Sequence, residues 1–169
     1  MREGINNNLL EDYRNVITNE ILSNETIIKI LSNDELDINS ADELLWKHLI
    51  PQQYIPDTIT ETGSYILYDI DENILYSKNS NHTTYTELTL YFWIFTHKDM
   101  PKYKEKLRND ILVRELKKLF SEIDNMGISK NHLIYNRIYN SVNDKYIGRL
   151  MAFKITDWSD AIRGVISGK

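Results

Sequence analysis

The chain has 169 residues, 41% of them hydrophobic, and its 20 basic and 25 acidic side chains give a formal net charge of −5. A chain of this length predicts one soluble domain that buries enough surface to need neither a disulfide nor a structural metal. The absence of cysteine excludes thiol catalysis, cysteine zinc sites and iron–sulfur clusters. The acidic balance argues against a general polyanion binder, and we expect no sequence-specific nucleic acid partner. No segment approaches the roughly 18 apolar residues of a spanning helix, so we expect no membrane insertion.

The first third of the chain has a helical pattern. Apolar residues recur at steps of three and four over residues 9–21 and, more briefly, over residues 27–31. Ser40 and Glu43 have the spacing of a capping box, in which each side chain bonds to a free backbone amide of the other residue. This box predicts a third helix over residues 41–49, which makes residues 1–50 a helical N-terminal region.

After Gly63 the apolar pattern changes to a period of two. Residues 65–70 read as a first strand, and residues 85–97 read as the strongest strand of the chain. Between them, residues 71–84 are rich in Asn, Ser, Asp and Thr. This stretch predicts either a long loop or an extended hairpin whose first arm carries Ile74, Leu75 and Tyr76.

The strand at residues 85–97 is apolar on both faces. One face carries Leu88, Leu90, Phe92 and Ile94, and the other carries Tyr91, Trp93 and Phe95. A strand with one face in water would alternate instead. The second face therefore needs a cover, either the N-terminal helices of the same chain or another subunit.

The last third predicts a helix followed by a hairpin. Asp99, Met100 and Pro101 resemble a helix start and Gly127 a helix end, which predicts a helix over about residues 102–126. Its apolar stripe consists of Leu107, Ile111, Leu112, Leu116, Leu119, Phe120 and Ile123. Residues 133–139 and 147–157 then predict a β-hairpin.

The expected fold class is α+β. It has an antiparallel twisted sheet of about four strands, one long amphipathic helix packed on it, and N-terminal helices. Residues 1–169 form a single domain, with the sheet and helix core at 63–157 and a C-terminal tail at 158–169.

No motif for catalysis or phosphate binding occurs, and the four histidines have no metal-ligand spacing. The one dense carboxylate group is Asp69, Asp71 and Glu72, which in a nuclease could hold a divalent cation. A nuclease core of the restriction type needs lysine on the next strand, where this chain has Thr89. We therefore expect no enzyme, no metal and no cofactor, with a small metal-dependent nuclease as the alternative.

The order of elements over roughly residues 9–157 resembles the tail terminator, or tail completion, proteins of tailed bacteriophages. The similarity is most specific in Tyr54-Ile55-Pro56-Asp57-Thr58-Ile59-Thr60-Glu61 before a strand and in a strand that ends Phe95-Thr96-His97-Lys98-Asp99. These stretches look like neck proteins from phages and prophages of low-GC Gram-positive bacteria. That family is defined by the order of its elements, so no functional residue carries over.

The resemblance implies a structural virion protein of the phage neck, assembled in the cytoplasm of the host bacterium. Such a protomer forms a homo-oligomeric ring, usually a hexamer, which caps the tail tube and stops its polymerisation. The ring joins the tail to the head connector, sometimes binds the tail sheath protein, and lets DNA pass through its lumen. A head-tail stopper or other connector protein is the alternative within the same class.

A ring requires a heterologous interface that closes, and tyrosine and tryptophan are favoured at interfaces. Eleven tyrosines, most of them in the strand half of the chain, agree with such a surface. We expect residues 71–84 to form an arm that becomes ordered only against a neighbour. The predicted subunit interface consists of Ile74, Leu75, Tyr76, Lys78, Tyr85, Tyr91, Trp93 and Phe95.

Overall fold

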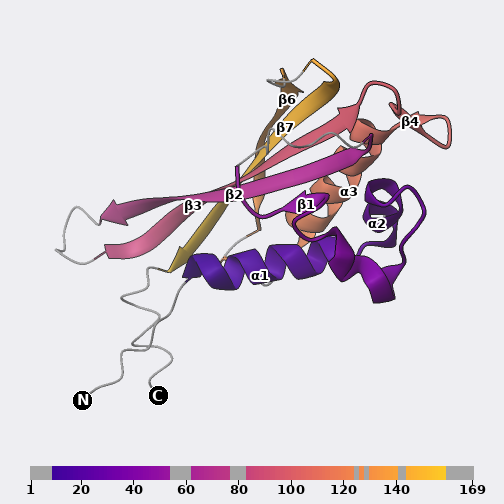
Figure 1. Cartoon of the computed structure of the whole chain (residues 1–169). Coiled ribbons are helices and arrows are strands. Elements are labelled where there is room, and N and C mark those ends of the chain that lie inside the picture. The colour runs from indigo at the N-terminus through magenta and orange to yellow at the C-terminus, as the bar shows by residue number, and fades with distance from the viewer. Residues whose placement is uncertain are drawn as a thin grey trace.

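The computed structural model describes residues 9–53, 62–76, 83–123, 126–127, 130–140 and 144–158, with side chains for these residues except 9, 74–76, 83–85 and 158. The predicted C-terminal tail lies outside this range apart from the backbone of Trp158. The elements, labelled in Figure 1, are α1 (Leu9–Leu22), α2 (Glu25–Leu31), the 3-10 helix η1 (Ile38–Leu44), β1 (Leu49–Ile50), β2 (Ser64–Tyr76), β3 (Thr83–His97), β4 (Lys102–Tyr103), β5 (Lys106–Leu107), α3 (Arg108–Glu122), β6 (His132–Tyr139) and β7 (Tyr146–Trp158).

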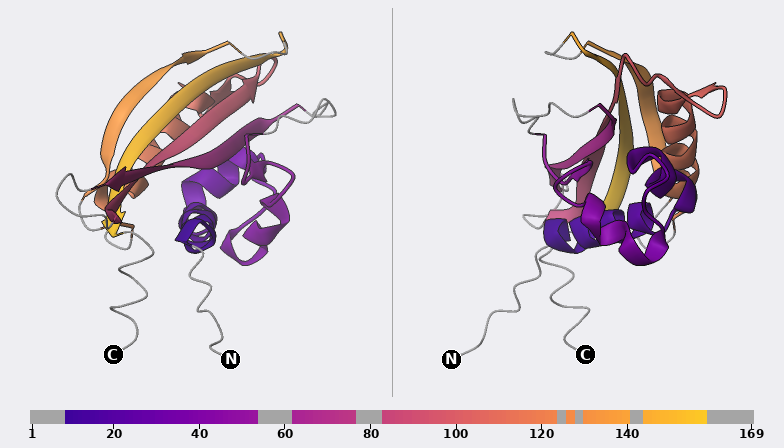
Figure 2. Two further views of the ribbon diagram at one scale, coloured as in Figure 1. Left: turned by 90° about the vertical axis from the view of Figure 1, so that its left-hand side faces the viewer. Right: turned by 45° about the vertical axis from the view of Figure 1, so that its right-hand side comes forward.

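The main sheet has the strand order β1-β2-β3-β7-β6. Its four long strands are antiparallel neighbours, as predicted, and the two-residue strand β1 adds a parallel edge to β2. The sheet is twisted and curved (Figure 2). The α+β class is therefore confirmed, and within this sheet β1 is the strand that the sequence did not predict.

The helices of the described residues all pack on one face of this sheet (Figure 2). The core between the two layers takes Ile17 from α1, Ile28 from α2 and Phe120 from α3 against Phe92 of β3 and Phe153 of β7. The ring centroids of Phe92 and Phe120 lie 4.9 Å apart in a tilted arrangement. Such aromatic pairs stabilise a core beyond their burial of apolar area. Among the described residues, no helix is both long and apolar enough to span a membrane.

The predicted helix at residues 41–49 is wrong. The capping box lies three residues earlier, where the Asp37 carboxylate accepts the N–H groups of Asn39 and Ser40 at 2.9 and 3.2 Å, and Ser40 Oγ accepts the N–H of Asp37 at 3.1 Å. The 3-10 helix that follows ends at Leu44. Leu49 and Ile50 instead pair with β2, and this pairing buries both side chains. A helix that ended at Pro51 would not necessarily bury both of them.

The long helix begins later than predicted, since residues 102–107 form the β4–β5 hairpin before α3. The reason is the buried guanidinium of Arg108. Its Nε donates to the carbonyl of Lys102 at 3.1 Å, and its Nη1 donates to the carbonyl of Ile30 and to Asn33 Oδ1 at 2.9 and 2.8 Å. These bonds fix the start of α3 against α2. The apolar stripe of the helix is otherwise as predicted, except that Leu107 is exposed.

Gly127 does not end this helix, whose last residue is Glu122. Its φ of +82° favours glycine, and a Cβ added there would lie 2.6 Å from the backbone oxygen of Thr156. Glycine is therefore required where the connection after α3 approaches β7. The predicted final hairpin is confirmed as β6 and β7.

Candidate subunit interface

The second face of the sheet carries its own buried cluster. It consists of Ile50, Tyr65, Leu67, Trp93, Phe95, Tyr146 and Leu150, with Tyr91, Tyr135 and Tyr139 packed at its margin. The rings of Tyr91 and Trp93 stack at 5.6 Å, and those of Phe95 and Tyr139 meet edge to face at 5.9 Å. Burial raises the pKa of the Tyr91 phenol. This cluster brings three of the predicted interface residues together.

Of the two covers that the sequence left open for this face, the N-terminal helices are ruled out, because their buried side chains belong to the cluster on the opposite face. Trp93 and Phe95 are nevertheless only 6% and 3% exposed within the single chain. They supply little free area for a partner. Of the three predicted residues on this face, only Tyr91 is half-exposed.

The predicted arm is an extended hairpin, the second of the two structures that the sequence allowed. Ile74 pairs with Thr86, Leu75 with Tyr85, and Tyr76 with Thr83, with a register shift between Leu75 and Tyr76. Residues 71–76 are thus already ordered by pairing within the chain, so the expectation that they order only against a neighbour is wrong. The side chains of Ile74, Leu75, Tyr76 and Tyr85 lie outside the described set, and so does Lys78 as a whole.

The three carboxylates that the nuclease alternative would use to hold a cation have different surroundings in the structure. Asp69 forms an ion pair with Arg14, and its Oδ1 accepts the N–H of Ile70 at 2.9 Å. Asp71 and Glu72 are exposed on the arm, where Glu72 Oε1 accepts from the hydroxyl of Thr86 at 3.3 Å. Within the described ranges, no group of three His, Asp or Glu side chains is placed to hold a metal ion.

The β6–β7 hairpin exposes apolar side chains that the sequence did not single out. Ile134 and Ile138 on β6 are 51% and 72% exposed, and Ile147 on β7 is also exposed. β6 is the last strand of the sheet, so its outer edge pairs with no strand in the described part of the chain. The signal in the sequence was the run Leu133-Ile134-Tyr135, which breaks the period of two where the ladder shifts register.

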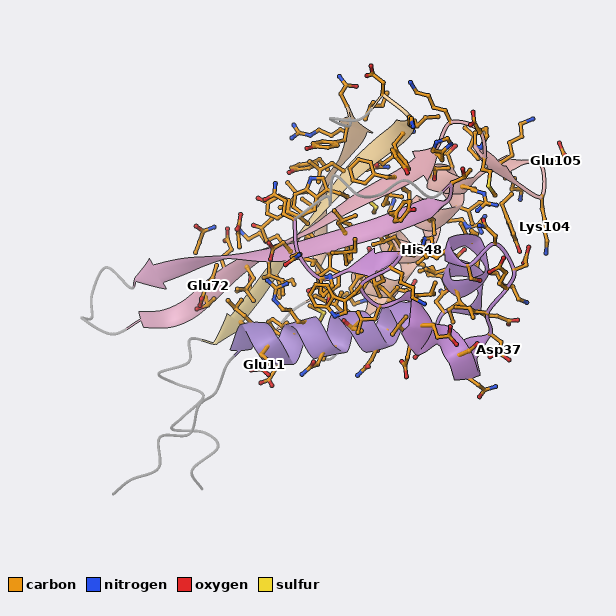
Figure 3. All side chains as sticks on the ribbon, viewed as in Figure 1. Glu11, Asp37, His48, Glu72, Lys104 and Glu105 are labelled. Atoms are coloured by element: carbon orange, nitrogen blue, oxygen red, sulfur yellow. The ribbon has the colours of Figure 1, made fainter. Side chains whose placement is uncertain are left out.

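A second exposed feature is the basic β4–β5 hairpin. Its two turn residues, Lys104 and Glu105, have φ angles of 47° and 66°, which non-glycine residues rarely adopt. A shallow cavity of about 330 Å³ lies beside it, lined by Lys104, Lys106 and Arg114 among other residues. The base of the hairpin is fixed because Tyr103 donates to Asp34 Oδ1 at 2.6 Å. Figure 3 shows Lys104 at the end of the molecule opposite Glu72 of the arm.

Comparison with known proteins gives one family. No curated protein matches the chain. A family model with the description YomW matches residues 24–155. This range runs from α2 into β7 and includes the β4–β5 hairpin and the strand β6 described above. The match spans well over half of the chain. The chain therefore belongs to the YomW family, a family of Bacillus phage and prophage type, and is a phage-related protein.

Proposed function

We propose that this protein is a structural component of a phage neck, a tail terminator whose ring caps the tail tube and joins the tail to the head connector. The observation that carries the proposal is the phage-type family together with a protomer whose sheet has an open edge and a protruding hairpin. Both features are suited to repeated association in a ring. The protein catalyses no reaction in this role.

The hairpin formed by β2 and β3 supports the proposal through its shape. Its end extends past the helical layer on the side away from the β4–β5 hairpin (Figure 1). A hairpin of this kind reaches beyond its own domain without losing its main-chain pairing, which continues to Tyr76 and Thr83. It can therefore contact a neighbouring subunit or the last ring of the tail tube.

The direct test is made in the phage or prophage that encodes the chain. Loss of the protein should give tails of uncontrolled length or tails unable to join heads, seen by electron microscopy. The purified protein should have the mass of a ring, or form rings when mixed with the tail tube protein. If tails keep their normal length but heads do not fill or retain DNA, the protein acts as the head-tail stopper instead.

A second test addresses the arm. Replacing residues 77–83, most of which lie outside the described part of the chain, with a short Gly-Ser turn should leave the monomer folded. Tail length control or head joining should then fail. Normal yield of infectious particles with this variant would show that the tip of the arm is not an interface.

The nuclease alternative is tested on the same protein. A purified sample should not cleave DNA with added magnesium or manganese. Cleavage that disappears in the Asp71→Asn, Glu72→Gln double variant would contradict the structural role, since these two exposed changes should leave the fold intact.

A further inference from the structure

We infer that copies of this chain join by continuing one β-sheet, with the outer edge of β6 in one copy pairing with residues 71–76 of β2 in the next copy. The inference rests on the proposed ring and identifies the surfaces that build it. Backbone pairing at an open edge is a common mode of protein association. Four features of the described residues support this contact.

The first feature is that the two edges lie at opposite margins of the sheet. In the order β1-β2-β3-β7-β6, strand β6 is one margin. At the other margin β1 pairs only with Ile66 and Leu67, so the rest of β2 has no strand on its outer side in the described chain. A contact between two different edges is heterologous, and it closes into a ring when the rotation between neighbouring copies divides a full turn and has no translation along the axis.

The second feature is the direction of the backbone groups on β2. The N–H of Ile66 donates to the carbonyl of His48 at 2.8 Å, so the backbone of Ile66 faces the outer edge. Because successive residues of a strand bond to opposite neighbours, Glu72, Ile74 and Tyr76 also present their N–H and C=O groups outward. The N–H of Ile70 belongs to the same row but already donates to Asp69 Oδ1. Residues 71–76 are therefore the free part of this edge.

The third feature is the direction of the backbone groups on β6. The N–H of Lys98 donates to the carbonyl of Lys145 at 2.8 Å, which fixes the alternation of hydrogen bonds between β3 and β7. Carried across β7, this alternation directs Arg137 and Tyr139 toward β7. Asn136 and Ile138 then present their backbone groups outward. The two open edges thus offer matching rows of donors and acceptors.

The fourth feature is the complementarity of the side chains. β6 bears exposed Ile134 and Ile138, and long apolar edges of this kind are normally covered in folded proteins. The exposed cations of the β6 side are Arg137 and, just before the strand, Lys130. The exposed side chains of the β2 segment include Asp71 and Glu72. Opposite charges across a strand pair are stabilising, whereas two copies of β6 would bring like charges together.

The absence of cysteine permits a clean cross-linking test on the full chain. Glu72→Cys is combined in turn with Ile134→Cys, Asn136→Cys and Ile138→Cys. The three double variants sample three registers in which β6 of one copy can pair with β2 of the next. On mild oxidation, at least one double variant should give a series of disulfide-linked oligomers that stops at the ring size. Directly opposed residues of an antiparallel strand pair have Cα atoms about 4.5–5.5 Å apart, which lies within the range that a disulfide spans. The matched control is Glu72→Cys with Ile38→Cys, because Ile38 is 53% exposed but lies on η1.

The outcomes separate the inference from the proposed function. Rings in solution without linked oligomers from any double variant would overturn the edge pairing and leave the ring intact. Linked dimers from Ile138→Cys alone would show a symmetric β6–β6 contact and would also overturn it. A protein that stays monomeric, both alone and with the tail tube protein, would contradict the proposed ring itself.

A substitution provides a second measurement without oxidation. Ile138→Lys places a charge on the most exposed apolar residue of β6. This change should reduce the mass of the assembly to that of a monomer, while the melting temperature of the monomer stays unchanged. Ile38→Lys, the matched change on η1, should leave the assembly intact. Equal assembly by both variants would contradict the inference.

Discussion

Tyr13, near the start of α1, donates a hydrogen bond to the buried carboxylate of Asp157, near the end of β7. The Tyr13 oxygen also accepts the backbone N–H of Gly127 at 2.9 Å. One phenol therefore joins the first helix, the last strand and the connection that follows α3. A buried polar group of this kind stabilises a fold only while its partners are present.

Tyr13→Phe should lower the free energy of unfolding by about 1–3 kcal/mol, because the variant removes a donor from a buried carboxylate while it keeps the ring. Urea denaturation followed by circular dichroism measures the change. Tyr139→Phe, on the margin of the second face, is the matched control and should change stability by less than about 0.5 kcal/mol. Equal midpoints for the wild type and Tyr13→Phe would contradict a structural role for this bond.

Leu116→Ala should cost about 2–5 kcal/mol, since Leu116 is fully buried between α3 and the sheet. Leu119, on the same helix, is only half-buried, so Leu119→Ala should cost less. Thermal denaturation of both variants gives the comparison. Lys117→Ala, at an exposed position between them, serves as the control, and a larger loss there than at Leu116 would contradict the orientation of the helix.

Glu105→Gly should stabilise the protein by about 1 kcal/mol, because glycine adopts the positive φ of this turn without the steric cost that Glu105 bears. Lys106→Gly is the matched change one residue later, in β5, where the backbone is extended. It should destabilise the protein by about 0.5–1 kcal/mol. The two variants should therefore shift the unfolding midpoint in opposite directions, and shifts of the same sign would contradict the described turn.

The Asp37 carboxylate accepts a hydrogen bond from the hydroxyl of Ser40 and others from the backbone N–H groups of Asn39 and Ser40, and these bonds lower its pKa. A folded-state pKa below the unfolded value adds stability at pH values above the unfolded pKa. That contribution is lost as the pH falls through the lowered value. The stability difference between the wild type and Asp37→Asn should thus shrink below about pH 4. A difference that stays constant from pH 7 to pH 2 would contradict this account.

The strand pattern was the most informative part of the sequence. The two apolar faces read from residues 85–97 correspond to the two buried clusters, with Phe92 in one and Trp93 in the other. Strand alternation is a local property, so it survives in the fold. The apolar stripe of α3 and the final hairpin follow from the same kind of local periodicity.

Long-range contacts decided what the sequence did not show. The β4–β5 turn contains no glycine or asparagine to signal a positive φ, and Arg108 holds its base through bonds to α2. The strand at Leu49 and Ile50 exists only because β2 offers an edge. The candidate interface depends on strand order in the same way. No local pattern shows that β6 lies at a margin, so Ile138 was missed while the buried Trp93 was predicted.

The bond between Tyr13 and Asp157 joins residues 144 positions apart in the chain. Because α1 begins and β7 ends at one corner of the domain (Figure 1), a linker could join these points and new termini could be opened in the turn at Lys104 and Glu105. In such a circular permutant the first helix follows the last strand directly. The entropic cost of closing a loop rises with the logarithm of the loop length. The contact between Tyr13 and Asp157 closes most of the chain in the natural order, and it would become a local contact in the permutant.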